Sequence, residues 1–460
     1  MSKENARKLF GTDGIRAVAG DYPLDANTIF ACGLALGHTL RKTTAEPRVI
    51  LGRDTRESGP WIAATLAAGL REAGARVESA GVITTPAVAF LARTHGFQAG
   101  VVISASHNPW RDNGIKLFGS DGFKLADAVE LAMEDEILHH AAEIEKQGAV
   151  APDPASLPPV VDNAAYQADY IQFLIDCVPG LSLAGLRIVA DCANGASAAV
   201  APELFRRLGG EVTLLNINPN GRNINDGCGA LHPDYVAAEV KSRGAELGLT
   251  FDGDADRCML TGARLNVING DAILLMVGRD LKARGMLTGD LVVATTMSNM
   301  GLEAALKHSG IRMLRAPVGD RYVLEQMLEH DAALGGEQSG HILLPHLATT
   351  GDGLLTSLVV LDLIARSGKS IEELTADLKV FPQVIVNVKV REKKPLQSVP
   401  SVAAAIRAAE EELEDSGRVV IRYSGTEPLA RVMIEAESDA AMKRHANAIA
   451  EAIRAELGVG

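Results

Sequence analysis

One loop of the sequence places a serine hydroxyl next to an imidazole. The segment VVISASHNPWRDNGIKLF (101–118) is an apolar run that ends in Ser-Ala-Ser-His-Asn-Pro, where Pro109 stops regular structure and exposes Ser106 and His107. A serine hydroxyl is a weak nucleophile until a base or a cation activates it, and His107 or a metal ion would serve. Taken alone, these residue types are more typical of a turn.

A second loop concentrates negative charge. In LGLTFDGDADR an apolar run delivers Asp252, Asp254 and Asp256 into a tight turn, and this lead-in argues against an exposed acidic turn. Carboxylates this close repel one another unless a hard cation neutralises them. An EF-hand loop is excluded, because the positions that need Gly and Glu hold Arg257 and Ala263. The loop therefore predicts a site for a small, oxygen-preferring ion such as Mg²⁺.

A third loop gathers groups that suit a sugar. LGGEQSGHILLP (334–345) packs two glycines, a carboxylate, an amide, a hydroxyl and an imidazole into a short stretch. Glu337 and Ser339 have the donors and acceptors that pair with ring hydroxyls. A polar turn without a ligand would have the same composition.

A fourth loop combines small residues with arginines. In RYSGTEPLARVMIEA the small residues can present backbone N–H groups and hydroxyls to an anion; they are Ser424, Gly425 and Thr426. Arg422 and Arg431 flank them and are suited to binding phosphate bidentately. A hairpin turn with surface arginines is the alternative interpretation.

The elements that would position these loops follow a recurring pattern. A β-branched run, a polar loop, an amphipathic helix closed by Gly and a second strand occur in sequence, starting at PRVILGRDTRESG (47–59), LRIVADCANGASA (186–198) and DLVVATTMSNMG (290–301). Each copy is a β-α-β unit, so the pattern predicts an α/β fold with largely parallel sheets covered on both faces.

Composition marks the expected boundaries between domains. The Pro-rich stretch 148–162 is typical of a linker, and further boundaries are expected near 258–262 and 368–382. After the last boundary, two strand-like runs and a closing amphipathic helix predict a smaller α+β domain. The predicted domains, each with one of the polar loops, are 1–155, 160–258, 259–370 and 376–460.

Composition also excludes several classes of partner. The chain has 460 residues and a net charge of −13, which argues against nucleic acid or an anionic membrane and leaves room for one small anionic substrate. Its five cysteines form no C-x-x-C pair, so we expect them to be reduced thiols. The sequence has no secretory signal, no long apolar run and no Walker or dinucleotide-binding glycine motif, so we expect a cytoplasmic protein that is neither a kinase nor a dehydrogenase.

Together the loops resemble the signature loops of the α-D-phosphohexomutase family over essentially the whole chain. SASHNP resembles the family's phosphoserine loop, DGDADR its metal loop, GEQSGH its sugar loop and RYSGTEP its phosphate loop. The resemblance implies three related mixed or parallel-sheet α/β domains and a smaller fourth domain around a central cleft. It also implies that Ser106, the serine directly before His-Asn-Pro, carries the phosphate, and not Ser104.

Three further segments are similar to the glucosamine branch of that family: FGTDGIR (10–16), Gln338 within GEQSGH, and TTGDGLLT (349–356). The segment NINDGCGALHP is also similar, although Ala230 and Leu231 replace the Ser-Thr common there, and Ala17 stands where Gly is usual. The resemblance implies interconversion of glucosamine 6-phosphate and glucosamine 1-phosphate through a 1,6-bisphosphate. A phosphoglucomutase or phosphomannomutase of the same family is the alternative.

The resemblance further implies a role for each site residue. One Mg²⁺ per site is expected at the phosphorylated Ser106 and the three aspartates, with Lys116 as general acid or base and His107 and Arg257 as supporting groups. Sugar hydroxyls are expected at Glu337, Ser339 and His341. Phosphate is expected at a set comprising Arg422, Ser424, Gly425, Thr426, Arg431 and Arg16. A hexosamine or glucose 1,6-bisphosphate is the expected primer, and a monomer or homodimer the expected assembly.

Two other classes of function remain to be weighed. An apolar strand that ends in Asp-x-Asp also suits phosphatases with an aspartyl nucleophile, which would carry an acyl phosphate on Asp252 or Asp254; the Asp-Gly-Thr continuation usual there is absent. A sugar-phosphate sensor without catalysis would be expected to lose the serine or a carboxylate, and this chain retains them.

Overall fold

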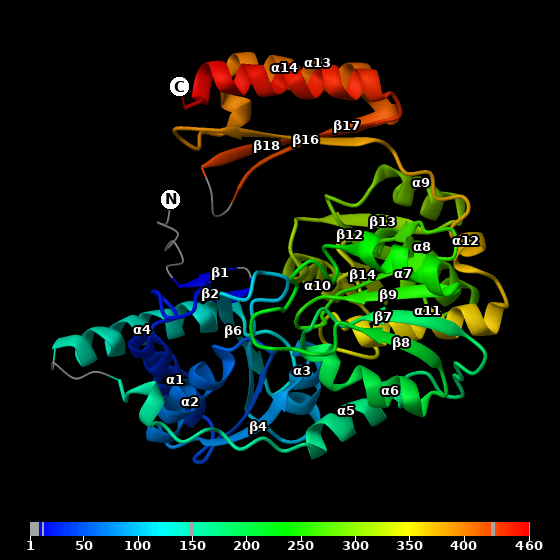
Figure 1. The fold of residues 1–460 in the computed structure, drawn as a ribbon. Helices are drawn as coiled ribbons and strands as arrows, with labels where there is room; N and C mark the ends of the chain where they lie inside the picture. Colours follow the sequence, from blue (N-terminus) through cyan, green and yellow to red (C-terminus); the bar gives the residue numbers. More distant parts are fainter. Residues whose placement is uncertain (1–8, 12, 147–150, 425–427, 460) are drawn as a thin grey trace. The chain divides into compact units, whose positions relative to one another are not determined.

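The computed structural model describes residues 9–11, 13–146, 151–424 and 428–459. The chain forms two compact units (Figure 1): the first comprises Met1–Thr295 and Ala316–Thr375, and the second Thr296–Arg315 and Ala376–Gly460. None of the helices in the described part combines the length and the apolar character that crossing a bilayer requires.

The first sheet of the first unit has the strand order β1-β2-β6-β5-β3-β4. Its strands are β1 (Phe10–Gly11), β2 (Gly14–Val18), β3 (Arg48–Arg53), β4 (Arg76–Val82), β5 (Ala99–Ile103) and β6 (Asp112–Gly119). Its helices are α1 (Ala26–Arg41), α2 (Gly59–Glu72), α3 (Thr85–Thr94) and α4 (Asp127–Lys146). β3 pairs in parallel with β4 and β5, whereas β6 runs antiparallel between β5 and β2, so the sheet is mixed.

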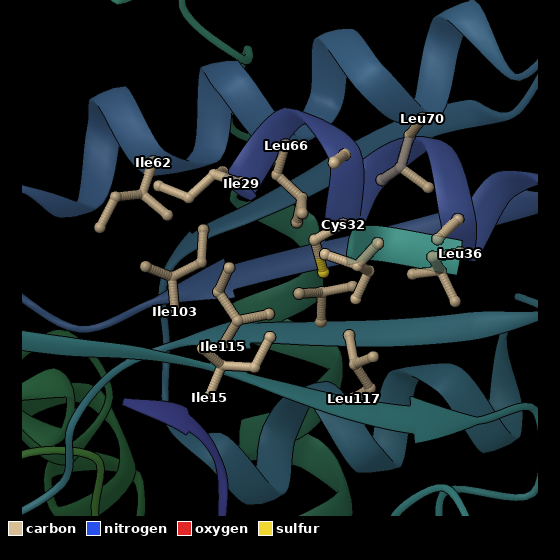
Figure 2. Packing of buried hydrophobic residues seen from close by; sticks show 14 of the residues in the cluster. Ile15, Ile29, Cys32, Leu36, Ile62, Leu66, Leu70, Ile103, Ile115 and Leu117 are labelled. Atoms are coloured by element: carbon tan, nitrogen blue, oxygen red, sulfur yellow. The ribbon is translucent and has the colours of Figure 1, made fainter. Parts of the chain in front are cut away.

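An aliphatic core lies between this sheet and the helices α1 and α2 (Figure 2). Ile29, Cys32 and Leu36 of α1 follow the helical period and point at the strands, as do Leu66 and Leu70 of α2. Every residue of β5 is buried, as expected of a strand covered on both faces. The loop that begins at the end of β5 therefore follows a fully buried strand.

The second sheet has the order β11-β10-β9-β7-β8, in which β7 pairs in parallel with β8 and β9. Its strands are β7 (Arg187–Asp191), β8 (Glu211–Leu215), β9 (Leu247–Phe251), β10 (Cys258–Gly262) and β11 (Val267–Ile268), and its helices are α5 (Ala165–Asp176), α6 (Ala201–Arg207) and α7 (Pro233–Arg243). The expected boundary near 258–262 falls inside this sheet, because β10 turns back and pairs antiparallel with β9.

The remaining strands of the first unit are β12 (Leu291–Thr295), β14 (Leu334–Gly336) and β15 (Ile342–Leu343), and its remaining helices are α8 (Gly270–Ala283), α10 (Asp320–Glu329), α11 (Gly353–Ser367) and α12 (Ile371–Leu374). β12 and β14 are parallel, and β15 returns antiparallel to β14. Asp352 caps α11 by accepting a hydrogen bond from the Leu355 N–H at 2.9 Å.

The second unit contains an antiparallel sheet with the order β16-β18-β17, covered on one face by two helices (Figure 1). Its elements are α9 (Met300–His308), β13 (Arg312–Ala316), β16 (Gln383–Lys389), α13 (Pro400–Leu413), β17 (Gly417–Tyr423), β18 (Leu429–Ala436) and α14 (Asp439–Leu457). Alternate residues of β17, Val419 and Ile421, face the helices, so Val420 and Arg422 lie on the opposite face.

The predicted β-α-β units are present as local elements. The first is β3-α2-β4, the second β7-α6-β8 and the third β12-α9-β13. The predicted linker 148–162 lies partly outside the described residues; its described part contains a short 3₁₀ turn at Pro154–Ser156. The antiparallel strands β6, β10 and β15 make each sheet less parallel than the repeat pattern predicts, because each returns through a short connection next to a polar loop.

Candidate active site

The Ser106 loop joins β5 to β6 and holds its hydroxyl against a carboxylate. Ser106 is 1% exposed, and its Oγ donates a hydrogen bond to Asp252 Oδ2 at 2.6 Å. The His107 Nδ1 lies farther away, 3.4 Å from the same Oγ. Ser106 has a φ of 52°, in the left-handed region, which costs a residue with a side chain about 1–3 kcal/mol. A strained backbone that presents a hydroxyl to a carboxylate is typical of a functional loop.

The predicted acidic loop follows β9 and is fully buried. One carboxylate oxygen from each of Asp252, Asp254 and Asp256 lies within 4.8 Å of the others. The Oδ1 atoms of Asp254 and Asp256 are buried and have no hydrogen-bond partner among the described residues. Buried carboxylate oxygens are normally paired, and hard cations take such oxygens as ligands. The three residues therefore fit the predicted divalent-metal site.

The charges in this loop are strongly coupled. Burial, together with the negative charges of Asp256 and Asp254, raises the pKa of Asp252 well above its usual range. Burial acts in the same direction on Asp256, but Lys116 and His341 overcome it and hold its pKa well below the usual range. A divalent cation would relieve the repulsion that the aspartates feel without it.

Lys116 lies in the middle of these carboxylates. Its Nζ is 2.9 Å from Asp254, 3.1 Å from Asp13 and 3.6 Å from Asp256, and the residue is 1% exposed. Burial alone would lower the pKa of Lys116, but Asp13, Asp254 and Asp256 raise it above that of free lysine. The Lys116 side chain is therefore an ammonium held by three carboxylates.

Lys116 belongs to a closed ring of alternating charges. Asp13, which pairs with Lys116, also pairs with Lys124, whose Nζ lies 2.6 Å away; the same Nζ lies 2.6 Å from Asp320. His341 closes the ring, because it lies 3.6 Å from Asp320 and 3.6 Å from Asp256. We call these groups the charge ring; in order they are Asp13, Lys124, Asp320, His341, Asp256 and Lys116. The sequence analysis missed Asp13, Lys124 and Asp320. Asp13 lies within the FGTDGIR segment, and the resemblance of this segment to the family could have identified Asp13 as a site residue.

Two arginines and a histidine also lie around the hydroxyl and the aspartates. The Arg257 N–H donates to Asp252 at 3.3 Å, and its Nε is 3.8 Å from Asp256; Arg16 forms an ion pair with Asp13. Burial lowers the pKa of His107 to about 4, with the positive charges of Arg257 and Arg16 acting in the same direction. His107 is therefore a neutral imidazole at neutral pH.

The predicted sugar loop joins β14 to β15 and divides into two parts. Glu337 and Ser339 stay partly exposed; Glu337 accepts hydrogen bonds from the Gly319 N–H at 3.1 Å and from the Ser339 hydroxyl at 3.2 Å. His341 is 3% exposed and lies in the charge ring instead. Burial alone would lower its pKa, but Asp256 and Asp320 raise the pKa of His341 to about 9.

The segments singled out by resemblance pack the sugar loop against the metal loop. Gln338 Nε2 donates to the buried Asp271 at 3.1 Å, so this amide anchors the loop to the start of α8. The Gly353 N–H donates to the Ala255 carbonyl at 2.9 Å. A Cβ at Gly353 would lie 2.3 Å from the Arg257 carbonyl oxygen, so only glycine fits there.

The predicted phosphate loop lies in the second unit, and Gly425 and Thr426 are outside the described residues. Arg422 of β17 and Arg431 of β18 face each other across the sheet. They line a hollow of about 360 Å³ together with Met297, Ile385, Asn387, Val420 and Met433. Burial and the charge of Arg431 lower the pKa of Arg422. Two like charges placed directly opposite are unfavourable unless an anion joins them.

Within the first unit, contacts thus link Ser106, the three aspartates, Lys116 and His341 into one site. Family models for phosphoglucomutase/phosphomannomutase match four successive parts of the chain: α/β/α domain I over residues 7–144, domain II over 168–264, domain III over 269–381 and the C-terminal domain over 385–452.

The chain belongs to the phosphoglucomutase/phosphomannomutase family.

Its relatives agree with this assignment. The phosphoglucosamine mutase of Koribacter versatilis is 58% identical over 98% of both chains, and that of Solibacter usitatus is 51% identical over 98% of this chain and all of the relative. The predicted family and the four-domain α/β fold class are confirmed, and the chain is an enzyme of the phosphohexomutase class.

Solved structures show the same fold. A family protein from Burkholderia thailandensis has a TM-score of 0.77 at 24% identity and covers 97% of this chain and 99% of its own. The N-acetylphosphoglucosamine mutase of Aspergillus fumigatus, solved with GlcNAc-6P and magnesium, has a TM-score of 0.62 at 18% identity and covers 98% and 97%. At these identities the comparison supports the shared architecture.

The aspartate cluster of this phosphohexomutase generates a prediction about metal binding. Asp254→Asn removes one charge and one free ligand oxygen, so the affinity for Mn²⁺, measured by titration calorimetry on the full chain, should fall at least about tenfold. Asp191→Asn is the matched control, since Asp191 is a buried carboxylate that instead accepts backbone bonds from Ala193 and Gly229. Equal Mn²⁺ affinity in the two variants would contradict the site.

Proposed function

We propose that this enzyme interconverts glucosamine 6-phosphate and glucosamine 1-phosphate through a phosphoserine at Ser106 and a 1,6-bisphosphate intermediate. The 2.6 Å hydrogen bond from the Ser106 hydroxyl to Asp252 is the observation that carries the mechanism. It joins the predicted nucleophile of the phosphoserine loop to a cluster of three buried carboxylates. The shared name of the two relatives supports the substrate.

One Mg²⁺ is proposed at Asp252, Asp254 and Asp256, with an oxygen of the Ser106 phosphate as a further ligand. When bound, the ion disperses the negative charge on the transferring phosphoryl group, which is the main requirement of such reactions. The unpartnered oxygens of Asp254 and Asp256 support this assignment. Arg16 and Arg257 each have a buried Nε without a hydrogen-bond partner among the described residues, which supports contact with phosphoryl oxygens.

The proposed reaction has two matched halves. In the first, the bond from phosphorus to Ser106 Oγ breaks and a bond from phosphorus to the sugar O1 forms, while the hydroxyl proton of O1 ends on Oγ. In the second, after the intermediate has turned around, the bond to O6 breaks, phosphorus returns to Oγ and the serine proton ends on O6. We assign the proton transfer to Lys116, which gives a proton to one oxygen and regains one from the other.

The remaining predicted residues are assigned to substrate binding. Glu337 and Ser339 are proposed to contact sugar hydroxyls, because they stay partly exposed on their loop. His341 is proposed to hold Asp256 in place, because it lies within the charge ring. Arg422, Ser424, Gly425, Thr426 and Arg431 are proposed to bind the phosphate that is not being transferred. The opposed arginines of β17 and β18 support this last assignment.

Ser106→Ala tests the nucleophile. Turnover of glucosamine 1-phosphate with Mg²⁺ and a bisphosphate primer should fall at least about 10³-fold, because no group replaces Oγ, while substrate binding persists. Mass spectrometry of the wild-type protein should find phosphate on Ser106 that resists hydroxylamine. Unchanged turnover, or a hydroxylamine-sensitive phosphate on Asp252 or Asp254, would favour the aspartyl mechanism.

Lys116→Met tests the proton carrier. Loss of the ammonium should lower kcat by about 10²–10⁴-fold with a smaller effect on KM, as for other acid–base groups. Lys42→Met is the control, because Lys42 is an exposed lysine paired with Glu136 at 2.9 Å. If kcat of the Lys116 variant stays near that of the control, the proton moves through another group.

The substrate is tested by comparing kcat/KM for glucosamine 1-phosphate, glucose 1-phosphate and mannose 1-phosphate under the same conditions. We expect a preference for the amino sugar of at least about tenfold, equal to about 1.4 kcal/mol. Equal or faster turnover of glucose or mannose 1-phosphate would retain the mechanism and assign the enzyme to the alternative branch.

A further inference from the structure

A buried arginine lies directly behind the Ser106 loop and is not part of the chemistry described above. Arg56 follows β3 and is 1% exposed. A guanidinium has five N–H donors, and in Arg56 all of them are used. Nε donates to Asp54 at 2.8 Å, Nη1 to the carbonyls of Pro109 and of Asp112 (2.9 Å), and Nη2 to those of Ser106 (3.0 Å) and Asn108 (2.9 Å).

The side-chain amide of Asn225 also donates to two of the carbonyls that Arg56 contacts. Asn225, in the loop between β8 and α7, donates its amide to the Ser106 carbonyl at 2.9 Å and to the Asn108 carbonyl at 3.2 Å. The backbone of Asn225 is itself fixed, because its N–H donates to the Ala193 carbonyl at 2.9 Å. The carbonyl of Ser106 is therefore held from two sides.

The amide side of Ser106 is held as well. Its N–H donates to Ser104 Oγ at 3.0 Å, and that hydroxyl donates to Asp54 Oδ2 at 2.6 Å. Asp54 also pairs with Arg56, and both side chains are fully buried. One Asp–Arg pair thus fixes both backbone groups of a residue whose φ of 52° is unfavourable for anything but glycine.

We infer that Arg56, Asp54 and Asn225 are positioning residues for phosphoryl transfer: they hold Ser106 in its left-handed conformation and direct the carbonyls of its loop away from the phosphoryl group. The inference rests on the proposed role of Ser106. Carbonyl oxygens that accept bonds from a buried cation cannot turn toward a dianionic phosphate and repel it. The same contacts keep Oγ at the aspartate cluster, and small errors in such a geometry slow transfer strongly.

Asn225→Asp is the mildest test, because it keeps the size of a partly exposed side chain and replaces the donor with a carboxylate that faces two carbonyls. Asn223→Asp is the matched control: Asn223 lies in the same loop, and its amide donates to the Asn218 carbonyl at 3.1 Å, away from the serine. Arg56→Lys, which keeps the charge and loses two donors, is the second variant.

Each variant is prepared with Ser106 phosphorylated and mixed with glucosamine 6-phosphate, and the single-turnover rate of phosphoryl loss from Ser106 is measured. We expect the rate to fall about 10–100-fold in Asn225→Asp and in Arg56→Lys. The Kd of the sugar phosphate and of Mn²⁺, together with the thermal midpoint of Asn225→Asp, should stay close to the values of Asn223→Asp. A structural role alone would lower the midpoint without changing the rate per folded molecule.

The positioning role and the proposed function can be disproved separately. If Ser106→Ala is inactive but Asn225→Asp and Arg56→Lys transfer phosphate as fast as Asn223→Asp, the positioning inference is wrong and the proposed function stands. If Ser106→Ala turns over normally, the proposed function itself is wrong. If the variants bind the sugar phosphate more weakly at an unchanged transfer rate, the three residues serve binding, and the inference is again wrong.

Discussion

The site depends on keeping three carboxylates and a serine hydroxyl together where they are buried from solvent. Asp252, Asp254 and Asp256 are buried, and their nearest oxygens lie within 4.8 Å of one another. Such a cluster is unfavourable without positive charge, and the fold supplies Lys116, Arg257 and His341 around it. The proposed divalent metal would complete this compensation.

The positive groups around the aspartates come from different sheets, which makes the charge ring a link between parts of the first unit. Lys116 lies on β6 and Lys124 follows it, whereas Asp320 and His341 come from the region of β14 and α10. Each member of the charge ring has an opposite charge on both sides, so changing one member also alters the next. Lys116, the proposed proton carrier, is therefore held by the same contacts that join the Ser106 loop, the aspartate loop and the loop of Glu337.

Backbone geometry supplies the other half of the site. Three of the loops that carry chemistry follow a strand with a parallel neighbour: β5 before Ser106, β9 before the aspartates and β14 before Glu337. Loops at the carboxyl ends of such strands are the usual place for a site in an α/β protein. The buried Arg56 then fixes the shape of the first loop, which hydrogen bonds within the loop do not do alone.

The sequence by itself predicted which residues would carry the chemistry, and two of the loops follow an apolar run that can be recognised locally: VVI before Ser106 and LGLTF before Asp252. It also determined the repeated β-α-β units and the family. Only the tertiary structure decided which groups surround them. Lys116 meets an aspartate 138 positions away, and Asn225 meets a serine 119 positions away. Contacts at such separations depend on how sheets and loops pack. Local sequence patterns therefore could not predict the raised pKa of Lys116, the position of His341 in the charge ring or the hydrogen bonds of Arg56 to the Ser106 loop.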